Sequence, residues 1–207
     1  MEKGMHLGLY RRYILGIRMP PNIERFRGKA ILHFSDTPST FYGAMRHIIA
    51  LLNPLYIVHT GDLADEIKLE LHPGELPLYK KKLVELVRVL SPVQGDRVVI
   101  VIGNHDHEES VRGLFPGGQV LDGRGRVDLL GMELNLSHTR EDLLMPLSRF
   151  NLFGHSCPLD EQGDKENILL NGLHAVHALH VESGEVLSIA YPAYVDDARF
   201  NRKKIGL

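Results

Sequence analysis

The stretch VVIVIGNHD, residues 98–106, joins a fully apolar run to a short polar segment that begins at Gly103. A continuous apolar run of this length is typical of a strand that is covered on both faces of its sheet. Such sheets are mostly parallel, with helices packed on their faces. We therefore predict an α/β protein in which residues 98–102 form a buried strand that is followed by Gly103 and Asn104.

The same arrangement of an apolar run followed by an acidic residue occurs twice earlier in the chain. Residues 30–34 precede Asp36, and residues 55–58 precede Asp62. In open α/β sheets, ligands bind beyond the carboxyl ends of the strands. Because Asp36, Asp62 and Asn104 each follow a predicted strand by one to four residues, we expect all three at one rim of the sheet.

Two segments between these strands show the apolar periodicity of a helix. Residues 40–52 are predicted to form the first helix, with Ser39 or Thr40 as its cap. Residues 76–90 are predicted to form the second. The apolar side of the second helix is expected to consist of Leu78, Leu83, Leu86, Val87 and Leu90. The first half of the chain is therefore expected to have the order β-α-β-α-β.

The second half of the chain is predicted to be mostly strand. Residues 126–130 and 132–136 are expected to pair around Gly131, and a short helix is expected through Leu143 and Leu144. Three further strands and two hairpin turns are predicted after it: strands 168–170, 174–181 and 186–190, with turns at Asn171-Gly172 and Ser183-Gly184. This order favours a layered α/β fold with a mixed sheet or two packed sheets.

Composition excludes several classes of protein. Hydrophobic residues make up 43% and charged residues 24% of the 207 residues, which suits one globular domain with a sizeable core. The net charge of -2 gives no support for binding nucleic acid or membrane through bulk charge. Cys157 is the only cysteine, so no intramolecular disulfide can form, as is usual in a reducing compartment.

Location and domain organisation follow from the same sequence. No apolar run approaches the roughly 20 residues that span a bilayer, and the N-terminal stretch is a poor signal peptide, so a cytoplasmic protein is expected. We interpret residues 1–27 as an N-terminal extension and residues 28–207 as one domain. Apolar residues recur in the extension at near-helical spacing, at Tyr10, Tyr13, Ile14 and Ile17. The extension is either a docking arm or lid, or a segment that packs on the outside of the domain.

Two further polar segments, Ser137-His138 and Gly154-His155, follow in the second half. Together with the three strand ends they supply carboxylates, imidazoles and one amide, which are ligands for a divalent metal ion. Turn chemistry alone can explain a polar residue after one strand. Five such segments in order, spread over about 120 residues, favour a metal-dependent hydrolase instead.

These five segments resemble the motifs of the calcineurin-like metallophosphoesterase family. The family pattern is Asp-x-His, Gly-Asp-x-x-Asp, Gly-Asn-His-Asp/Glu, a lone His, and Gly-His-x-His. The resemblance covers residues 29–190, and segments 61–65 and 103–106 match completely. It implies a four-layer sandwich of two mixed β-sheets flanked by helices.

The resemblance also implies metal ligands and catalytic residues. The implied metal ligands are Asp36, Asp62, Asn104, His138 and His155, with Asp62 bridging two ions. His105 would protonate the leaving oxygen or clamp the phosphoryl group, and Asp65 would orient His105. One or two divalent ions per chain (Mn, Fe or Zn) would activate a water that hydrolyses a phosphodiester or phosphomonoester. The substrate would be a phosphorylated small molecule, a nucleotide or another phosphoester.

Two positions depart from the family pattern, and both would serve the same metal ion. Pro38 and Cys157 stand where the family has histidine. Proline has no ligating side chain, whereas a Cys157 thiolate would favour zinc or iron. The alternatives are a one-metal site, a first ion held by Asp36, Asp62, Cys157 and waters, or a catalytically impaired binding or scaffold protein. A further alternative is a zinc protein with Cys157 as its reactive thiol.

The remaining histidines are expected to have structural roles. His33 lies inside a predicted strand and is expected to pack in the core. His59 is expected either to line the cleft or to hydrogen-bond to a ligand. Of His174, His177 and His180, only the first and the last can share one face of a strand.

Overall fold

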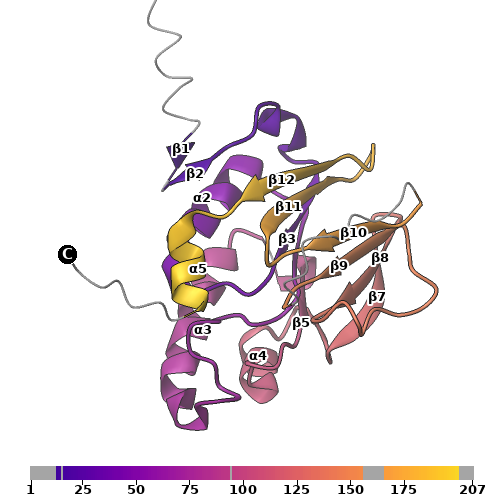
Figure 1. The fold of residues 1–207 in the computed structure, drawn as a ribbon. Helices are drawn as coiled ribbons and strands as arrows, with labels where there is room; N and C mark the ends of the chain where they lie inside the picture. Colours follow the sequence, from indigo (N-terminus) through magenta and orange to yellow (C-terminus); the bar gives the residue numbers. More distant parts are fainter. Residues whose placement is uncertain (1–12, 15, 94, 156–165, 201–207) are drawn as a thin grey trace, which may run out of the picture.

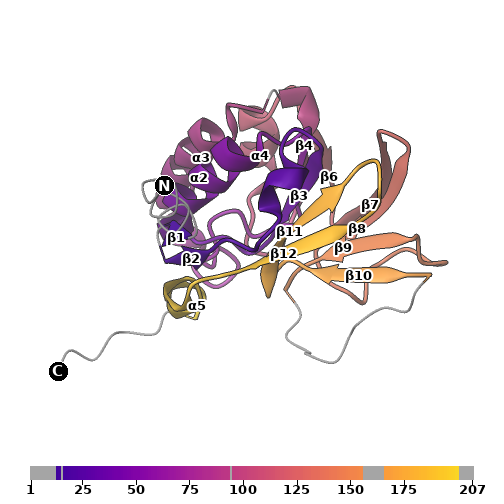
Figure 2. The same cartoon turned by 90° about the horizontal axis from the view of Figure 1, so that it is seen from above.

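The structure is a computed structural model that describes residues 13–14, 16–93, 95–155 and 166–200. Within these residues, two β-sheets pack face to face, and helices lie on the far side of the larger sheet (Figure 1; Figure 2). The buried apolar side chains of this part of the chain form two clusters, one between the helices and the larger sheet and one between the sheets. The expected fold class, two mixed sheets flanked by helices, is confirmed.

The larger sheet contains six strands of the described chain. In spatial order they are β12 (Val186–Ala190), β11 (Ala175–His180), β3 (Ala30–Phe34), β4 (Tyr56–His59), β5 (Val98–Val101) and β6 (Gln119–Leu121). Strands β3 to β6 run parallel, and β11 is antiparallel to both β3 and β12. Every residue of β3 and β5 is buried, as expected for apolar strands that are covered on both faces.

The smaller sheet contains four strands within the same ranges. In spatial order they are β10 (Ile168–Asn171), β9 (Phe150–Phe153), β8 (Met132–Ser137) and β7 (Arg124–Leu129). Strands β7 and β8 form the hairpin expected around Gly131, and β9 is parallel to both β8 and β10. The smaller sheet is therefore also mixed.

The helices cover the outer face of the larger sheet and its edge (Figure 2). The α-helices of the described residues are α2 (Tyr42–Leu52), α3 (Leu76–Leu90), α4 (Glu108–Leu114) and α5 (Ala193–Arg199). Short 3-10 turns are η1 (Ile23–Phe26), η2 (Ser39–Phe41), η3 (Pro73–Glu75) and η4 (Gly95–Arg97). None of the helices in the described part of the chain has the length and apolar character needed to cross a membrane.

The helix expected over 40–52 begins later than predicted. Ser39 belongs to η2, so α2 starts at Tyr42 and neither Ser39 nor Thr40 caps it. The Ser39 hydroxyl instead donates a hydrogen bond to the carboxylate of Glu66. The predicted cap residue therefore makes a tertiary contact to Glu66, and α2 has no side-chain cap.

The apolar side of α3 also differs from the prediction. Leu78 is 42% exposed, whereas Tyr79 and Val89 are buried alongside Leu83 and Leu86. The helix is therefore rotated relative to the expected face. The rotation brings the Tyr79 hydroxyl within 2.8 Å of the carboxylate of Asp106, a polar contact that hydrophobic periodicity does not register.

Two local predictions in the second half are wrong. Leu143 and Leu144 lie in irregular structure, because the Asn135 side chain hydrogen-bonds to both backbone groups of Leu144. Asn135 Nδ2 donates to the Leu144 carbonyl at 2.9 Å, and Asn135 Oδ1 accepts from the Leu144 N–H at 3.2 Å. Asn171-Gly172 does not form a hairpin turn, since β10 and β11 lie in different sheets. Ser183-Gly184 does turn between β11 and its antiparallel neighbour β12.

The described part of the N-terminal extension packs on the domain. The helical spacing is not realised, because β1 (Tyr13–Ile14) and β2 (Ile17–Arg18) form an antiparallel ribbon. Ile17, Met19 and Phe26 are buried in the core between helices and sheet. This burial favours the packed segment over a free arm. Tyr10 lies outside the described residues, and the division at residue 27 stays a prediction.

Candidate metal centre

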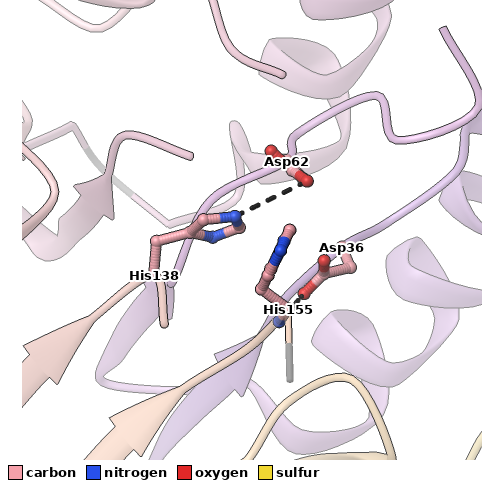
Figure 3. Close-up of side chains that lie close together, drawn as sticks. All are labelled: Asp36, Asp62, His138 and His155. Atoms are coloured by element: carbon pink, nitrogen blue, oxygen red, sulfur yellow. Dashed lines mark hydrogen bonds and ion pairs between the residues drawn. The ribbon is translucent and has the colours of Figure 1, made fainter. Parts of the chain in front are cut away.

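The polar segments that follow strands of both sheets meet at one rim. Asp36 and Asp62 follow β3 and β4 of the larger sheet, and His138 and His155 follow β8 and β9 of the smaller one. One ligand atom from each of the four lies within 4.8 Å of the others. The side chains point toward one another (Figure 3). The structure thus brings together four of the predicted metal ligands, two from each sheet.

Three of these four residues adopt a left-handed backbone conformation. The φ angles are +50° at Asp36, +57° at Asp62 and +57° at His155. A residue with a side chain pays of order 1–3 kcal/mol for this conformation, and it persists where the surrounding structure holds it. Such strain concentrates at functional sites, which supports a functional role for this cluster.

Asp36 connects the two sheets through its carboxylate. Its Oδ2 accepts a hydrogen bond from the Ser35 hydroxyl at 2.6 Å and another from the backbone N–H of His155 at 3.0 Å. The backbone at Gly154 passes so close that a Cβ there would overlap the Ser35 hydroxyl and Asp36 Oδ2. Only glycine fits at this position, which explains why a glycine follows β9 here.

The carboxylate of Asp62 lies at the centre of the cluster and is 1% exposed. Its Oδ1 accepts the backbone N–H of His105 at 3.0 Å. Its Oδ2 is buried and has no hydrogen-bond partner among the described residues. Burial, and then the neighbouring carboxylates, raise the pKa of Asp62 well above its usual range. A buried oxygen without a donor is costly, and a bound cation would remove that cost.

The ring of His138 directs its Nε2 at Asn104 and at the Asp62 carboxylate. Its Nδ1 lies 2.7 Å from the carbonyl oxygen of Thr60, so in the neutral ring the proton is on Nδ1 and Nε2 is an acceptor. That Nε2 lies 2.9 Å from Asn104 Oδ1 and 3.6 Å from Asp62 Oδ2. Asn104, the fifth predicted ligand, therefore also faces the cluster.

His138 Nε2 lies 2.9 Å from Asn104 Oδ1 and 3.6 Å from Asp62 Oδ2. An imidazole nitrogen, an amide oxygen and a carboxylate oxygen in this arrangement fit a divalent cation. These donor types suit Mn, Fe or Zn. The His138 and His155 rings, 4.9 Å apart between centroids, complete the donor set. Pro38 offers no ligand beside Asp36, and Cys157 lies outside the described residues.

His105 and Asp65 lie next to the cluster. Atoms of Asp62, Asp65 and His105 approach within 4.8 Å of one another. The Asp65 carboxylate forms an ion pair with Lys68, and burial raises the pKa of Asp65 to about 6. Burial lowers the pKa of His105 to about 4, so the ring is neutral near pH 7. Their catalytic roles stay predictions.

Asp106 has a structural role that the sequence alone did not assign. Its half-buried carboxylate accepts hydrogen bonds, all between 2.8 and 2.9 Å, from the backbone of Asp62, Leu63 and Gly103 and from the hydroxyl of Tyr79. It therefore joins the loops that follow β4 and β5. The place of Asp106 within the third motif was a signal for its importance. Tyr79 gave no such signal, because it lies in α3, 27 positions before Asp106.

Glu70 is a second residue that sequence reasoning missed. Its Oε2 accepts a hydrogen bond from Asn104 Nδ2 at 2.5 Å and lies 3.8 Å from His105 Nδ1. A cavity of about 380 Å³ opens beside it. Its walls combine the apolar side chains of Leu69, Pro73 and Leu76 with the polar ones of Glu70, Asn104, Asp106 and His107.

His33, His59 and His177 make structural contacts in the interior, as expected for His33. His33 is fully buried, with Nε2 2.9 Å from the Thr60 hydroxyl, and its ring stacks on His177 at 5.7 Å. His59 contacts the Thr37 hydroxyl at 2.8 Å. Burial lowers the pKa of His59 to about 3 and of His177 to about 4. His174 is exposed.

This chain is similar to known proteins in its sequence and in its fold. A family model described as calcineurin-like phosphoesterase matches residues 29–190. The solved phosphoesterase YfcE from E. coli is 19% identical, covers 79% of this chain and 99% of its own, and has a TM-score of 0.50. A protein of unknown function from Aquifex aeolicus, AQ665, is 15% identical over 69% of this chain and 89% of its own, with a TM-score of 0.37. No curated protein sequence matches this chain. The resemblance seen in the motifs is confirmed, and the chain belongs to the calcineurin-like phosphoesterase family.

Proposed function

We propose that this protein is a metal-dependent phosphoesterase that hydrolyses a phosphodiester or phosphomonoester of a small molecule or nucleotide. The observation that carries the proposal is the buried, unpartnered Oδ2 of Asp62, which lies 3.6 Å from Nε2 of His138. The family supports hydrolysis of phosphoesters, and the acceptor cluster supports a divalent cation. The single cysteine supports a reducing compartment such as the cytoplasm.

Different residues of the cluster would bind different cations. Asp62, Asn104, His138 and His155 would hold one cation, and Asp36 would hold a second or complete the first. A divalent cation there would supply an activated water and neutralise charge on the phosphoryl group. Pro38 leaves any second ion with fewer protein ligands, so we propose a site that holds one ion more tightly than the other.

His105 would act on the phosphoester itself. Its side chain is largely buried and neutral in the free protein, because burial lowers its pKa to about 4. A phosphoester bound beside it brings negative charge, which raises the pKa of an imidazole. His105 would then donate a hydrogen bond to the phosphoryl group or a proton to the leaving oxygen. Lys68 donates a hydrogen bond to the carboxylate of Asp65, which lies close to His105.

The test is hydrolysis of p-nitrophenyl phosphate and bis(p-nitrophenyl) phosphate with added Mn²⁺. We expect Mn²⁺-dependent turnover that falls at least about 100-fold in Asp62→Asn, since the variant removes a charge that binds the cation. Asp96→Asn, at an exposed position of η4, is the matched control and should keep full activity.

The ratio of the two rates would separate monoester from diester preference. Absence of turnover with Mn²⁺, Fe²⁺ and Zn²⁺ alike would overturn the proposal. It would favour a non-catalytic binding protein on the same fold.

A further inference from the structure

The last residue of α5, Arg199, is a buried cation that contacts the loop carrying Asp36. Arg199 is 1% exposed. Its Nε donates to the carbonyl oxygen of Asp36 at 2.6 Å, and its Nη2 donates to that of Ser35 at 3.1 Å. Its Nη1 donates to the carbonyl oxygen of Leu173 at 2.7 Å. A buried guanidinium is costly unless its donors are satisfied, so these contacts define where α5 docks.

The backbone of Asp36 is held on both sides of its side chain. Its N–H donates to the carbonyl oxygen of Gly61 at 3.0 Å, and its own carbonyl accepts from Arg199. The residue has a φ of +50°, which a side chain disfavours. Because both peptide groups are fixed, the Asp36 carboxylate is directed at the cluster and at the N–H of His155.

The guanidinium is itself fixed in position. It lies over the ring of Tyr191, 4.3 Å from the centroid, and the Tyr191 hydroxyl donates to the carbonyl oxygen of Gly172 at 3.0 Å. Asp196 Oδ1 lies 3.2 Å from Nη1. A planar cation that is stacked and hydrogen-bonded in this way loses little freedom when it holds a backbone turn.

We infer that Arg199 is a positioning residue of the metal centre, which fixes the left-handed turn at Asp36 so that its carboxylate faces the cation. This inference rests on the proposed metal-dependent function. Arg199 and α5 lie beyond residue 190, where the match to the family model ends. The C-terminal helix is thus part of the site without contributing a ligand, and the docking of α5 is coupled to metal affinity.

The experiment measures Mn²⁺ affinity of the full chain by isothermal titration calorimetry. Arg199→Ala is expected to weaken binding about 10- to 100-fold, the usual effect of removing a residue that orients a metal ligand. Val195→Ala is the matched control, because Val195 is buried in the same helix and makes none of the Asp36 contacts. It should lower thermal stability while leaving the Mn²⁺ dissociation constant within about twofold of wild type.

Chemical rescue separates positioning from general stability. Ethylguanidinium replaces the atoms that Arg199→Ala removes, so millimolar ethylguanidinium should restore most of the lost Mn²⁺ affinity, whereas ethylammonium should not. If Arg199→Ala does not fold, the Mn²⁺ affinity of Arg199→Lys tests the inference instead. Lysine keeps the charge but cannot span two carbonyl oxygens as a fork, so we expect affinity weakened about tenfold.

The outcomes distinguish this inference from the proposed function. Wild-type protein that binds Mn²⁺ together with an Arg199 variant of equal affinity would overturn the role of Arg199 and leave the metal centre intact. Wild-type protein that binds no Mn²⁺, Fe²⁺ or Zn²⁺ would overturn the proposed function, and this inference with it.

Discussion

The carboxylate of Glu70 determines which end of the Asn104 amide faces the cluster of predicted metal ligands. Glu70 Oε2 accepts from Asn104 Nδ2 at 2.5 Å, which leaves Oδ1 2.9 Å from His138 Nε2. A carboxylate can only accept hydrogen bonds, so the amide cannot turn its oxygen toward Glu70 without losing this bond. Glu70 therefore selects the orientation in which Asn104 can ligate a cation.

Glu70→Ala should therefore weaken both Mn²⁺ affinity and phosphoesterase activity, by about 10- to 100-fold. Glu70→Gln keeps an acceptor oxygen and should lose less. Glu75→Ala, at an exposed position of η3, is the matched control. Calorimetric titration with Mn²⁺ checks this, and wild-type affinity in Glu70→Ala would show that Asn104 is oriented without Glu70.

Asp106→Asn should destabilise the fold rather than change the chemistry directly. The amide nitrogen of asparagine would face backbone donors, so we expect a loss of about 3 kcal/mol, and about 1–2 kcal/mol for Tyr79→Phe. Urea unfolding measures both. The double variant should lose less than the sum, because the two side chains share one hydrogen bond. Strict additivity would mean that this bond contributes nothing.

Mn²⁺ binding should strengthen with rising pH. Burial and neighbouring carboxylates raise the pKa of Asp62, and burial raises the pKa of Asp65 to about 6. A proton on Asp62 competes directly with the cation, and a proton on Asp65 removes a negative charge beside the site, so affinity should rise between about pH 5 and about pH 7. Binding near pH 6 should release protons, seen as a binding enthalpy that changes with the ionisation enthalpy of the buffer. A flat affinity profile over this range would contradict the raised pKa values.

The buried His33–His177 stack should make the protein sensitive to acid. Burial lowers the pKa of His177 from 6.5 to about 4. The unfolded chain therefore binds the proton first as the pH falls, so the stabilisation present above pH 6.5 is lost toward pH 4. The loss amounts to about 3 kcal/mol.

His177→Gln should flatten this part of the stability profile, measured by urea unfolding of the metal-free protein at several pH values. The comparison is made between variant and wild type, because the raised carboxylate pKa values act in the opposite direction. Parallel profiles for the two proteins would show that His177 does not carry the acid sensitivity.

Strands β3, β4 and β5 and the convergence of their ends could be predicted from the sequence, because each of these strands is a short apolar run that stops at a polar segment. Residues 98–101 form β5 as the continuous apolar run indicated, and Gly131 lies in the predicted hairpin turn. The rim then follows from the geometry of parallel strands. Local sequence patterns were therefore sufficient to predict the strands that are buried on both faces of the sheet.

Contacts between distant side chains could not be predicted in this way. Asn135 prevents a helix at Leu144 through two side-chain hydrogen bonds, and no periodicity encodes them. Arg199 reaches Asp36 across 163 positions. Asn171-Gly172 has the composition of a hairpin turn, yet here the chain passes from one sheet to the other. Such outcomes depend on which surfaces meet, which a single sequence does not specify.

The division of the cluster between two sheets has a mechanical consequence. Asp36 and Asp62 follow strands of the larger sheet, and His138 and His155 follow strands of the smaller one. A cation bound to both pairs would cross-link the two halves of the sandwich at the rim. At a free concentration 100 times its dissociation constant it would add about 2.7 kcal/mol to the free energy of unfolding. The supply of metal would then affect the stability of the folded protein as well as its rate of substrate turnover.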